Sequence, residues 1–130
     1  MLHHVELYVS RIDVSRAFWT GILTRTGWKQ SARWQDGFTL VSGDGAYLTF
    51  VQVASRYQSH RYHRCAVGLN HLAFSVRSRE EVDALKQYCI ENNIPDLYAD
   101  RYPFANGGKD YYALFIEDPD RIKVEFVVSG

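Results

Sequence analysis

The sequence has 130 residues, of which 46% are hydrophobic, enough to bury the core of one compact domain. Its 15 Lys and Arg residues are balanced by 15 Asp and Glu residues, so the formal net charge is zero. This balance argues against broad electrostatic attraction, and we therefore expect neither nucleic acid nor a membrane surface as a partner.

The first half of the chain predicts a strand, a helix and three more strands. Residues 2–9, LHHVELYV, alternate between two faces, as a half-buried strand does. Helical spacing follows from about Asp13 to Thr26, and Gly27 is a natural end. The apolar residues that recur at this spacing are Val14, Ala17, Phe18 and Ile22. Glycines then separate three extended segments: 28–34, 38–43 and 46–53.

The same order of elements begins again after a loop over residues 54–67. Residues 69–76, LNHLAFSV, predict a strand, and residues 78–93 predict a helix. Ser78 and Glu81 have the S-x-x-E spacing of a capping box at its start. The helix face expected to be buried carries Val82, Leu85 and Cys89. Three extended segments follow: 96–101, 111–118 and 121–128.

The two halves can be superposed on each other. Placing HVELYV on HLAFSV puts His4 on His71, and placing AYLTFV on IKVEFV puts Thr49 on Glu125. Neither half could bury both faces of its sheet alone. We therefore predict an α+β fold in one domain, residues 1–130. Two paired βαβββ modules, about 1–53 and 68–130, would form a curved mixed sheet around a cup, with the helices outside.

Two cysteines and the first residues indicate the compartment. Cys65 and Cys89 form neither a CxxC pair nor a zinc-ligand spacing, so free thiols in the cytoplasm are expected. The start, MLHHVELYVS, lacks the charged residues and apolar run of a signal peptide. No stretch approaches the length needed to span a membrane.

Three polar side chains occur on strands whose other face is apolar: His4, His71 and Glu125. If the modules pack with pseudo-twofold symmetry, these side chains would converge. Two imidazoles and a carboxylate suit one divalent ion such as iron, zinc, nickel or manganese. Three protein ligands leave coordination positions open, which is typical of a catalytic metal rather than a structural one. The same histidines could instead be hydrogen-bonded structural residues.

The chain resembles the vicinal oxygen chelate superfamily. The resemblance is carried by HHVELYVSRIDVSRAFW, GLNHLAFSV and FIEDPDRIKVEFV, and it covers essentially the whole chain. That superfamily includes glyoxalase I, fosfomycin-resistance thiol transferases, extradiol dioxygenases and bleomycin-binding proteins. The resemblance implies paired βαβββ modules around a metal cup, a homodimer and a small-molecule substrate. Its metal-ligand positions carry over to His4, His71 and Glu125.

The chain departs from the superfamily at two positions. The fourth ligand position, a Glu in glyoxalase I, is Thr49 here. A hydroxyl is a poor ligand, so a three-ligand site is expected, with Thr49 facing the cup but not binding the metal. In the turn DPDR, Arg121 stands where the family usually has Gly, and we expect that turn to form without a positive φ.

The expected catalytic residue is Glu125. Tyr111 and Tyr112 open a strand with one ring on each face, and the sequence leaves open which ring faces the site. The segments 56–64 and 104–110 can each be read as ordinary loops or as parts facing a ligand. The expected substrate-binding residues are Tyr8, Trp34, Thr49, His63 and Tyr111.

These features predict a metalloenzyme of the glyoxalase family acting on a small molecule with vicinal oxygens, of the lyase or isomerase type. A fosfomycin-type thiol transferase or an extradiol-type dioxygenase is the alternative within the same class. A metal-free ligand-binding protein of the bleomycin-resistance type is the alternative of another class. Metal analysis of protein purified without chelator separates these possibilities, because a simple binder does not need the three ligands.

Overall fold

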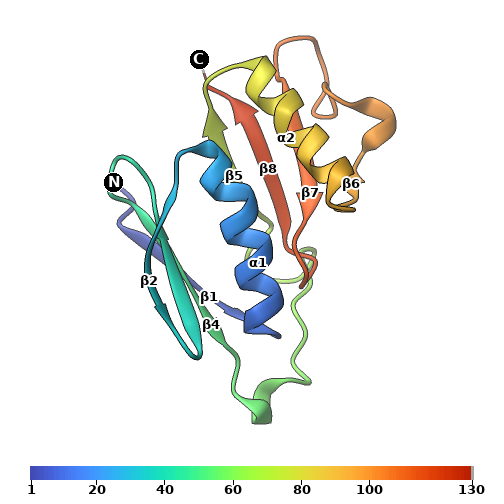
Figure 1. The fold of residues 1–130 in the computed structure, drawn as a ribbon. Helices are drawn as coiled ribbons and strands as arrows, with labels where there is room; N and C mark the ends of the chain where they lie inside the picture. Colours follow the sequence, from blue (N-terminus) through green and yellow to red (C-terminus); the bar gives the residue numbers. More distant parts are fainter. Residues whose placement is uncertain (130) are drawn as a thin grey trace. The chain divides into compact units, whose positions relative to one another are not determined.

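The computed structural model describes residues 1–129. The chain divides into two compact units, Met1–Arg61 and Tyr62–Gly130, called here the first and second unit. Each unit contains one four-stranded mixed sheet and one α-helix (Figure 1). The prediction of an α+β fold built from two βαβββ modules is therefore confirmed. No helix among residues 1–129 is long and apolar enough to cross a membrane.

In the first unit the strands are ordered β1-β4-β3-β2. The outer strand β1 runs parallel to β4, and the remaining neighbours are antiparallel. A short 3-10 turn ends the helix at Gly27, whose φ of 91° is readily adopted only by glycine. The elements are β1 (His4–Val9), α1 (Ile12–Leu23), β2 (Lys29–Trp34), β3 (Gly37–Val41) and β4 (Tyr47–Gln52).

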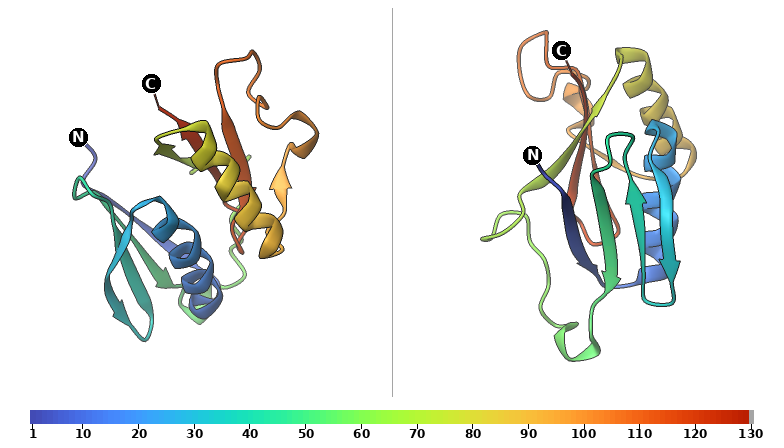
Figure 2. Two further views of the ribbon diagram at one scale, coloured as in Figure 1. Left: turned by 45° about the horizontal axis from the view of Figure 1, so that its top comes forward. Right: turned by 90° about the vertical axis from the view of Figure 1, so that its left-hand side faces the viewer.

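The second unit repeats this arrangement, with strand order β5-β8-β7-β6. Here β5 runs parallel to β8, and the other pairs are antiparallel. The elements are β5 (His71–Val76), α2 (Arg79–Glu91), β6 (Asp96–Leu97), β7 (Ala113–Glu117) and β8 (Lys123–Val128). In the two views of Figure 2, each helix lies along one face of the sheet of its own unit.

The helix-facing side of each sheet forms the core of its unit. In the first unit the ring of Trp19 lies 4.9 Å from that of Phe50, which stacks on Phe38 at 4.8 Å. In the second unit Phe74 stacks on Phe126 at 5.5 Å. The expected buried residues of α2, namely Val82, Leu85 and Cys89, are indeed buried. Because strand side chains alternate, the opposite face of each sheet is free to carry polar residues.

The buried face of α1 differs from the expected one. The sequence pattern placed Ala17 and Phe18 on that face, but Ala17 is exposed and Phe18 only half-buried. The buried residues are instead Ser15, Trp19, Ile22 and Leu23. Seating the large indole of Trp19 against the sheet turns the helix so that the smaller apolar residues move towards its rim.

Two local expectations about the second unit are wrong. The extended segment predicted for residues 96–101 ends after Leu97, because Tyr98 has a left-handed φ of 59° and starts a 3-10 turn over Ala99–Arg101. Arg121 also has a positive φ, of 67°, in a turn expected to form without one. The Asp118 carboxylate accepts from the backbone N–H of Asp120 at 2.9 Å and of Ile122 at 2.7 Å, which holds this turn.

The start of α2 is capped as its sequence predicts. The Ser78 hydroxyl accepts from the backbone N–H of Glu81 at 3.2 Å. The Glu81 carboxylate returns to the backbone N–H of Arg77 at 2.9 Å, one residue before the cap. Replacing Ser78 by Ala should lower the free energy of unfolding by about 1 kcal/mol, measured by urea denaturation. Ser59→Ala, at an exposed turn, is the matched control and should change it little. Equal effects of the two variants would contradict the cap.

Candidate functional site

The side of the second sheet that faces away from α2 carries the candidate site. Parallel pairing puts His71 beside Lys123 and Ala73 beside Glu125, and antiparallel pairing puts Phe115 beside Glu125. Residues that are directly paired project to the same face of a sheet. The strand pattern thus gathers one imidazole, one ammonium group and one carboxylate on a single face, while Phe126 faces the core.

His71 and Glu125 are in direct contact. The Nε2 atom of His71 lies 3.1 Å from Oε2 of Glu125, which is only 2% exposed. The other ring nitrogen, Nδ1, lies 2.7 Å from the amide oxygen of Asn70. An amide oxygen only accepts, so Nδ1 donates, and in the neutral ring Nε2 then carries a lone pair. In the neutral ring two acceptor atoms would therefore face each other, so this arrangement calls for a proton on Nε2 or a cation between the two atoms.

Tyr111 holds the second carboxylate oxygen of Glu125. Its hydroxyl donates to Oε1 at 2.5 Å, and this bond, together with burial, raises the pKa of Tyr111 to about 12. The neighbouring Tyr112 points to the other face, where its hydroxyl donates to Asp83 on α2 at 2.6 Å. Of the two rings that the sequence left open, Tyr111 is the one beside Glu125.

A pocket of about 360 Å³ opens at these residues, a volume suited to a small molecule. All of its lining comes from the second unit. Besides His71, Tyr111 and Glu125, it is lined by Tyr98, Arg101, Ala105, Asn106, Phe115 and Lys123. Ala105 and Asn106 belong to the Gly-containing segment 104–110, so that segment borders the pocket.

The first unit carries a related but different set. His4 opens β1 as His71 opens β5, and Thr49 is the third residue of β4 as Glu125 is of β8. The His4 ring is exposed and stacks on Tyr47 at 4.7 Å. Thr49 is 8% exposed, and its hydroxyl lies 2.9 Å from that of Thr39. In this unit the carboxylate beside Thr49 is Glu6, its partner across the β1–β4 pair.

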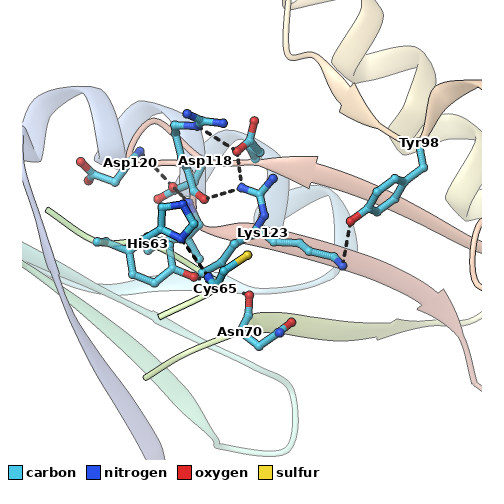
Figure 3. Close-up of polar contacts among 12 residues, drawn as sticks. His63, Cys65, Asn70, Tyr98, Asp118, Asp120 and Lys123 are labelled. Carbon is cyan, nitrogen blue, oxygen red and sulfur yellow. Dashed lines mark hydrogen bonds and ion pairs between the residues drawn. The ribbon is translucent and has the colours of Figure 1, made fainter. Parts of the chain in front are cut away.

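The remaining predicted substrate-binding residues have separate surroundings. Tyr8 is 72% exposed, on the same face of β1 as His4 and Glu6. Trp34 is 43% exposed, and its ring lies so close to Gly37 that a Cβ there would come within 2.3 Å of it. His63 is exposed in the loop before β5, where its Nδ1 accepts from the backbone N–H of Cys65 at 3.0 Å (Figure 3).

Among residues 1–129, no group of three or more His, Cys, Asp or Glu side chains is gathered closely enough to hold a metal ion. The second unit supplies two of the three predicted ligands, His71 and Glu125, in contact with each other. His4 belongs to the first unit.

Sequence reasoning missed four residues that line the pocket: Phe115, Lys123, Tyr98 and Arg101. Lys123 could have been found, because it lies two residues before Glu125 and so shares its face of the strand. Tyr98 and Arg101 gave no such signal, because the segment that carries them is a left-handed residue followed by a 3-10 turn and not the expected strand. Their place at the pocket depends on tertiary structure.

Comparison with known proteins identifies the family. The family model described as Glyoxalase/Bleomycin resistance protein/Dioxygenase superfamily matches residues 1–126. The uncharacterized protein YqjT of Bacillus subtilis (strain 168) is 46% identical over 129 residues, which cover 99% of both chains. This chain belongs to that superfamily.

Solved structures show the same fold. The crystal structure of a proposed glyoxalase from Bacillus halodurans is 47% identical and superposes with a TM-score of 0.94, covering 99% of this chain and 96% of the other. A lactoylglutathione lyase from Agrobacterium tumefaciens is 21% identical with a TM-score of 0.68, covering 99% of this chain and 93% of the other. At that identity the second likeness concerns the fold alone.

The bond between Tyr111 and Glu125 has a pH-dependent consequence. Tyr111→Phe removes the donor and should lower the free energy of unfolding by about 1 kcal/mol at pH 7. A tyrosine whose folded pKa lies above its unfolded value of about 10 stabilises the fold below that pH, and this stabilisation is lost as the pH rises towards about 12. The difference between wild type and variant should therefore shrink between pH 9 and about 12 in urea denaturation.

Tyr57→Phe, at a half-exposed ring, is the control for this measurement and should leave stability unchanged at pH 7. A stability difference for Tyr111→Phe that stays constant over the same pH range would show that the hydroxyl does not bond the carboxylate.

Proposed function

We propose that this protein is a divalent-metal-dependent enzyme that acts on a small molecule with vicinal oxygens, in a reaction of the lyase or isomerase type. The observation that carries the proposal is the contact between Nε2 of His71 and Oε2 of Glu125 at 3.1 Å. Asn70 fixes the imidazole so that its lone pair is directed at the carboxylate. A ring nitrogen and a carboxylate oxygen held in this way accommodate a positive charge between them, and a divalent metal ion is the proposed source of that charge.

The residues that would hold the ion are His71, Glu125 and His4. His4 is included because it occupies in the first unit the place that His71 occupies in the second. In this proposal His4 and the His71–Glu125 pair come either from one chain or from two chains of a homodimer. Imidazole and carboxylate ligands suit iron, zinc, nickel or manganese. Such an ion would supply Lewis acidity towards the oxygens of a substrate.

The chain's own groups have distinct tasks in this proposal. Glu125 is the catalytic carboxylate, since it borders the pocket with one oxygen directed at His71. Tyr111 orients it by donating its hydroxyl to Oε1. The Phe115 ring excludes water from one side of the carboxylate. Tyr8, Trp34, Thr49 and His63 are proposed to contact substrate.

The proposal extends to partners and location. The substrate is a small molecule, the assembly is a homodimer, and the protein works in the cytoplasm. Support for a reducing compartment comes from Cys65 and Cys89, which are both free thiols.

The central test is metal binding. Glu125→Gln keeps the shape of the side chain but removes its charge. It should weaken Zn²⁺ or Mn²⁺ binding, measured by calorimetry, by on the order of 100-fold, because changing a residue that only hydrogen-bonds to a metal ligand already costs about 10–100-fold in affinity. Glu80→Gln, an exposed carboxylate in the first turn of α2, is the matched control and should bind as the wild type does. Equal affinities for the two variants would remove Glu125 from the site.

Thr49 separates a three-ligand site from a four-ligand site. Its hydroxyl is engaged with Thr39, so Thr49→Val should leave metal affinity within about twofold of the wild type. A loss as large as that of Glu125→Gln would make Thr49 a ligand and contradict the proposal.

Turnover decides between enzyme and binder. Metal-loaded protein should convert a member of a panel of vicinal dicarbonyls, hydroxy acids and catechols, and removal of the ion should abolish that turnover. Ligand binding that needs no metal, without turnover of any compound, would instead support a binding protein of the bleomycin-resistance type.

A further inference from the structure

Lys123 is a half-buried cation whose neighbouring carboxylate is already paired. Its partner across the β7–β8 pair is Glu117. The Glu117 carboxylate contacts the guanidinium of Arg64 at 2.5 Å and that of Arg121 at 3.3 Å. Lys123 forms no ion pair within the described part of the chain. Its ammonium group instead reaches the hydroxyl of Tyr98 at 3.2 Å, as Figure 3 shows.

Aromatic rings hold this ammonium group in place. Its nitrogen lies 5.0 Å from the ring centre of Tyr98 and 5.0 Å from that of Phe115. The guanidinium of Arg101 also lies over the Tyr98 ring, 4.9 Å from the ring centre. Ring faces offset part of the cost of removing a cation from water, but they do not neutralise it. Two cations therefore gather around one tyrosine at the wall of the pocket.

The charge of the pocket lining is unbalanced. Lys123 and Arg101 contribute two positive charges, and Glu125 contributes one negative charge that Tyr111 and His71 already contact. Lys123 and Glu125 are two residues apart on one strand face, so their Cα atoms are separated by about 7 Å. One small molecule can therefore reach both groups.

We propose that the Lys123–Arg101 side of the pocket is an anion subsite, and that the substrate is a small acid. Its carboxylate, phosphate or phosphonate group binds between Lys123 and Arg101, and its vicinal oxygens are directed at His71 and Glu125. The assignment of the ligand as substrate rests on the function proposed above. The anion subsite itself rests on the pairing, ring contacts and lining of Lys123.

The test is an NMR titration of the metal-free full chain with inorganic phosphate, lactate and propane-1,2-diol. Lactate and the diol differ by the carboxylate group, and phosphate distinguishes a phosphate-type from a carboxylate-type ligand. Phosphate or lactate should shift the amide signals of Lys123 and Tyr98, and the diol should not. No shift with either anion, or equal shifts with the diol, would overturn the proposal.

Variants locate the effect. Lys123→Met keeps the length of the side chain and should weaken the binding of the preferred anion at least tenfold, whereas Lys123→Arg should retain most of it. Lys29→Met, on the exposed strand β2, is the matched control and should bind as the wild type does. Undiminished anion binding by a folded Lys123→Met variant would refute the subsite. If that variant does not fold, Arg101→Ala takes its place and must weaken anion binding at least tenfold for the subsite to stand.

Metal calorimetry on the same proteins separates the two proposals. Lys123→Met should bind Zn²⁺ or Mn²⁺ as the wild type does, because Lys123 is not a ligand. Anion binding that depends on Lys123 in a chain that takes up no metal would leave the subsite standing and end the metalloenzyme proposal. Normal metal uptake without anion binding would leave the metalloenzyme proposal standing and end the anion subsite.

Discussion

The site depends on the contact between Nε2 of His71 and Oε2 of Glu125, at 3.1 Å. Water cannot stabilise the negative charge of a carboxylate that is only 2% exposed, so neighbouring side chains must do so. Tyr111 supplies a donor to one oxygen, and Asn70 fixes the ring that approaches the other. Because the second unit buries this carboxylate, changing Glu125 will affect stability as well as binding.

The parallel pairing of the first and last strands in each unit decides which residues meet. In the second unit it puts Ala73 beside Glu125, and in the first it puts Glu6 beside Thr49. The carboxylate thus lies on the last strand of the second unit but on the first strand of the first unit. The small Ala73 leaves room beside Glu125, and the Thr49 hydroxyl is used by Thr39. One topology therefore carries two different polar sets.

The sequence predicted the two modules because period-two alternation is a local signal that both halves repeat, and because a capping box marks the start of the second helix. Its errors come from tertiary contacts. The Trp19 indole turns α1 so that Ala17 is exposed, and Tyr98 adopts a left-handed conformation that ends β6. The candidate histidines and Glu125 could be selected by the repeat. Arg101 could not, because its place at the pocket depends on that unpredicted turn.

Anomalous X-ray diffraction from crystals of the metal-loaded protein would show whether His71 and Glu125 bind a metal ion. We expect one strong metal peak per chain, coordinated by His71 and Glu125 together with His4 of the same chain or of a second copy, with no Thr49 oxygen bound to it. A peak elsewhere, or a crystal soaked in Zn²⁺ or Mn²⁺ in which His71 and Glu125 still contact each other with no ion between them, would contradict it.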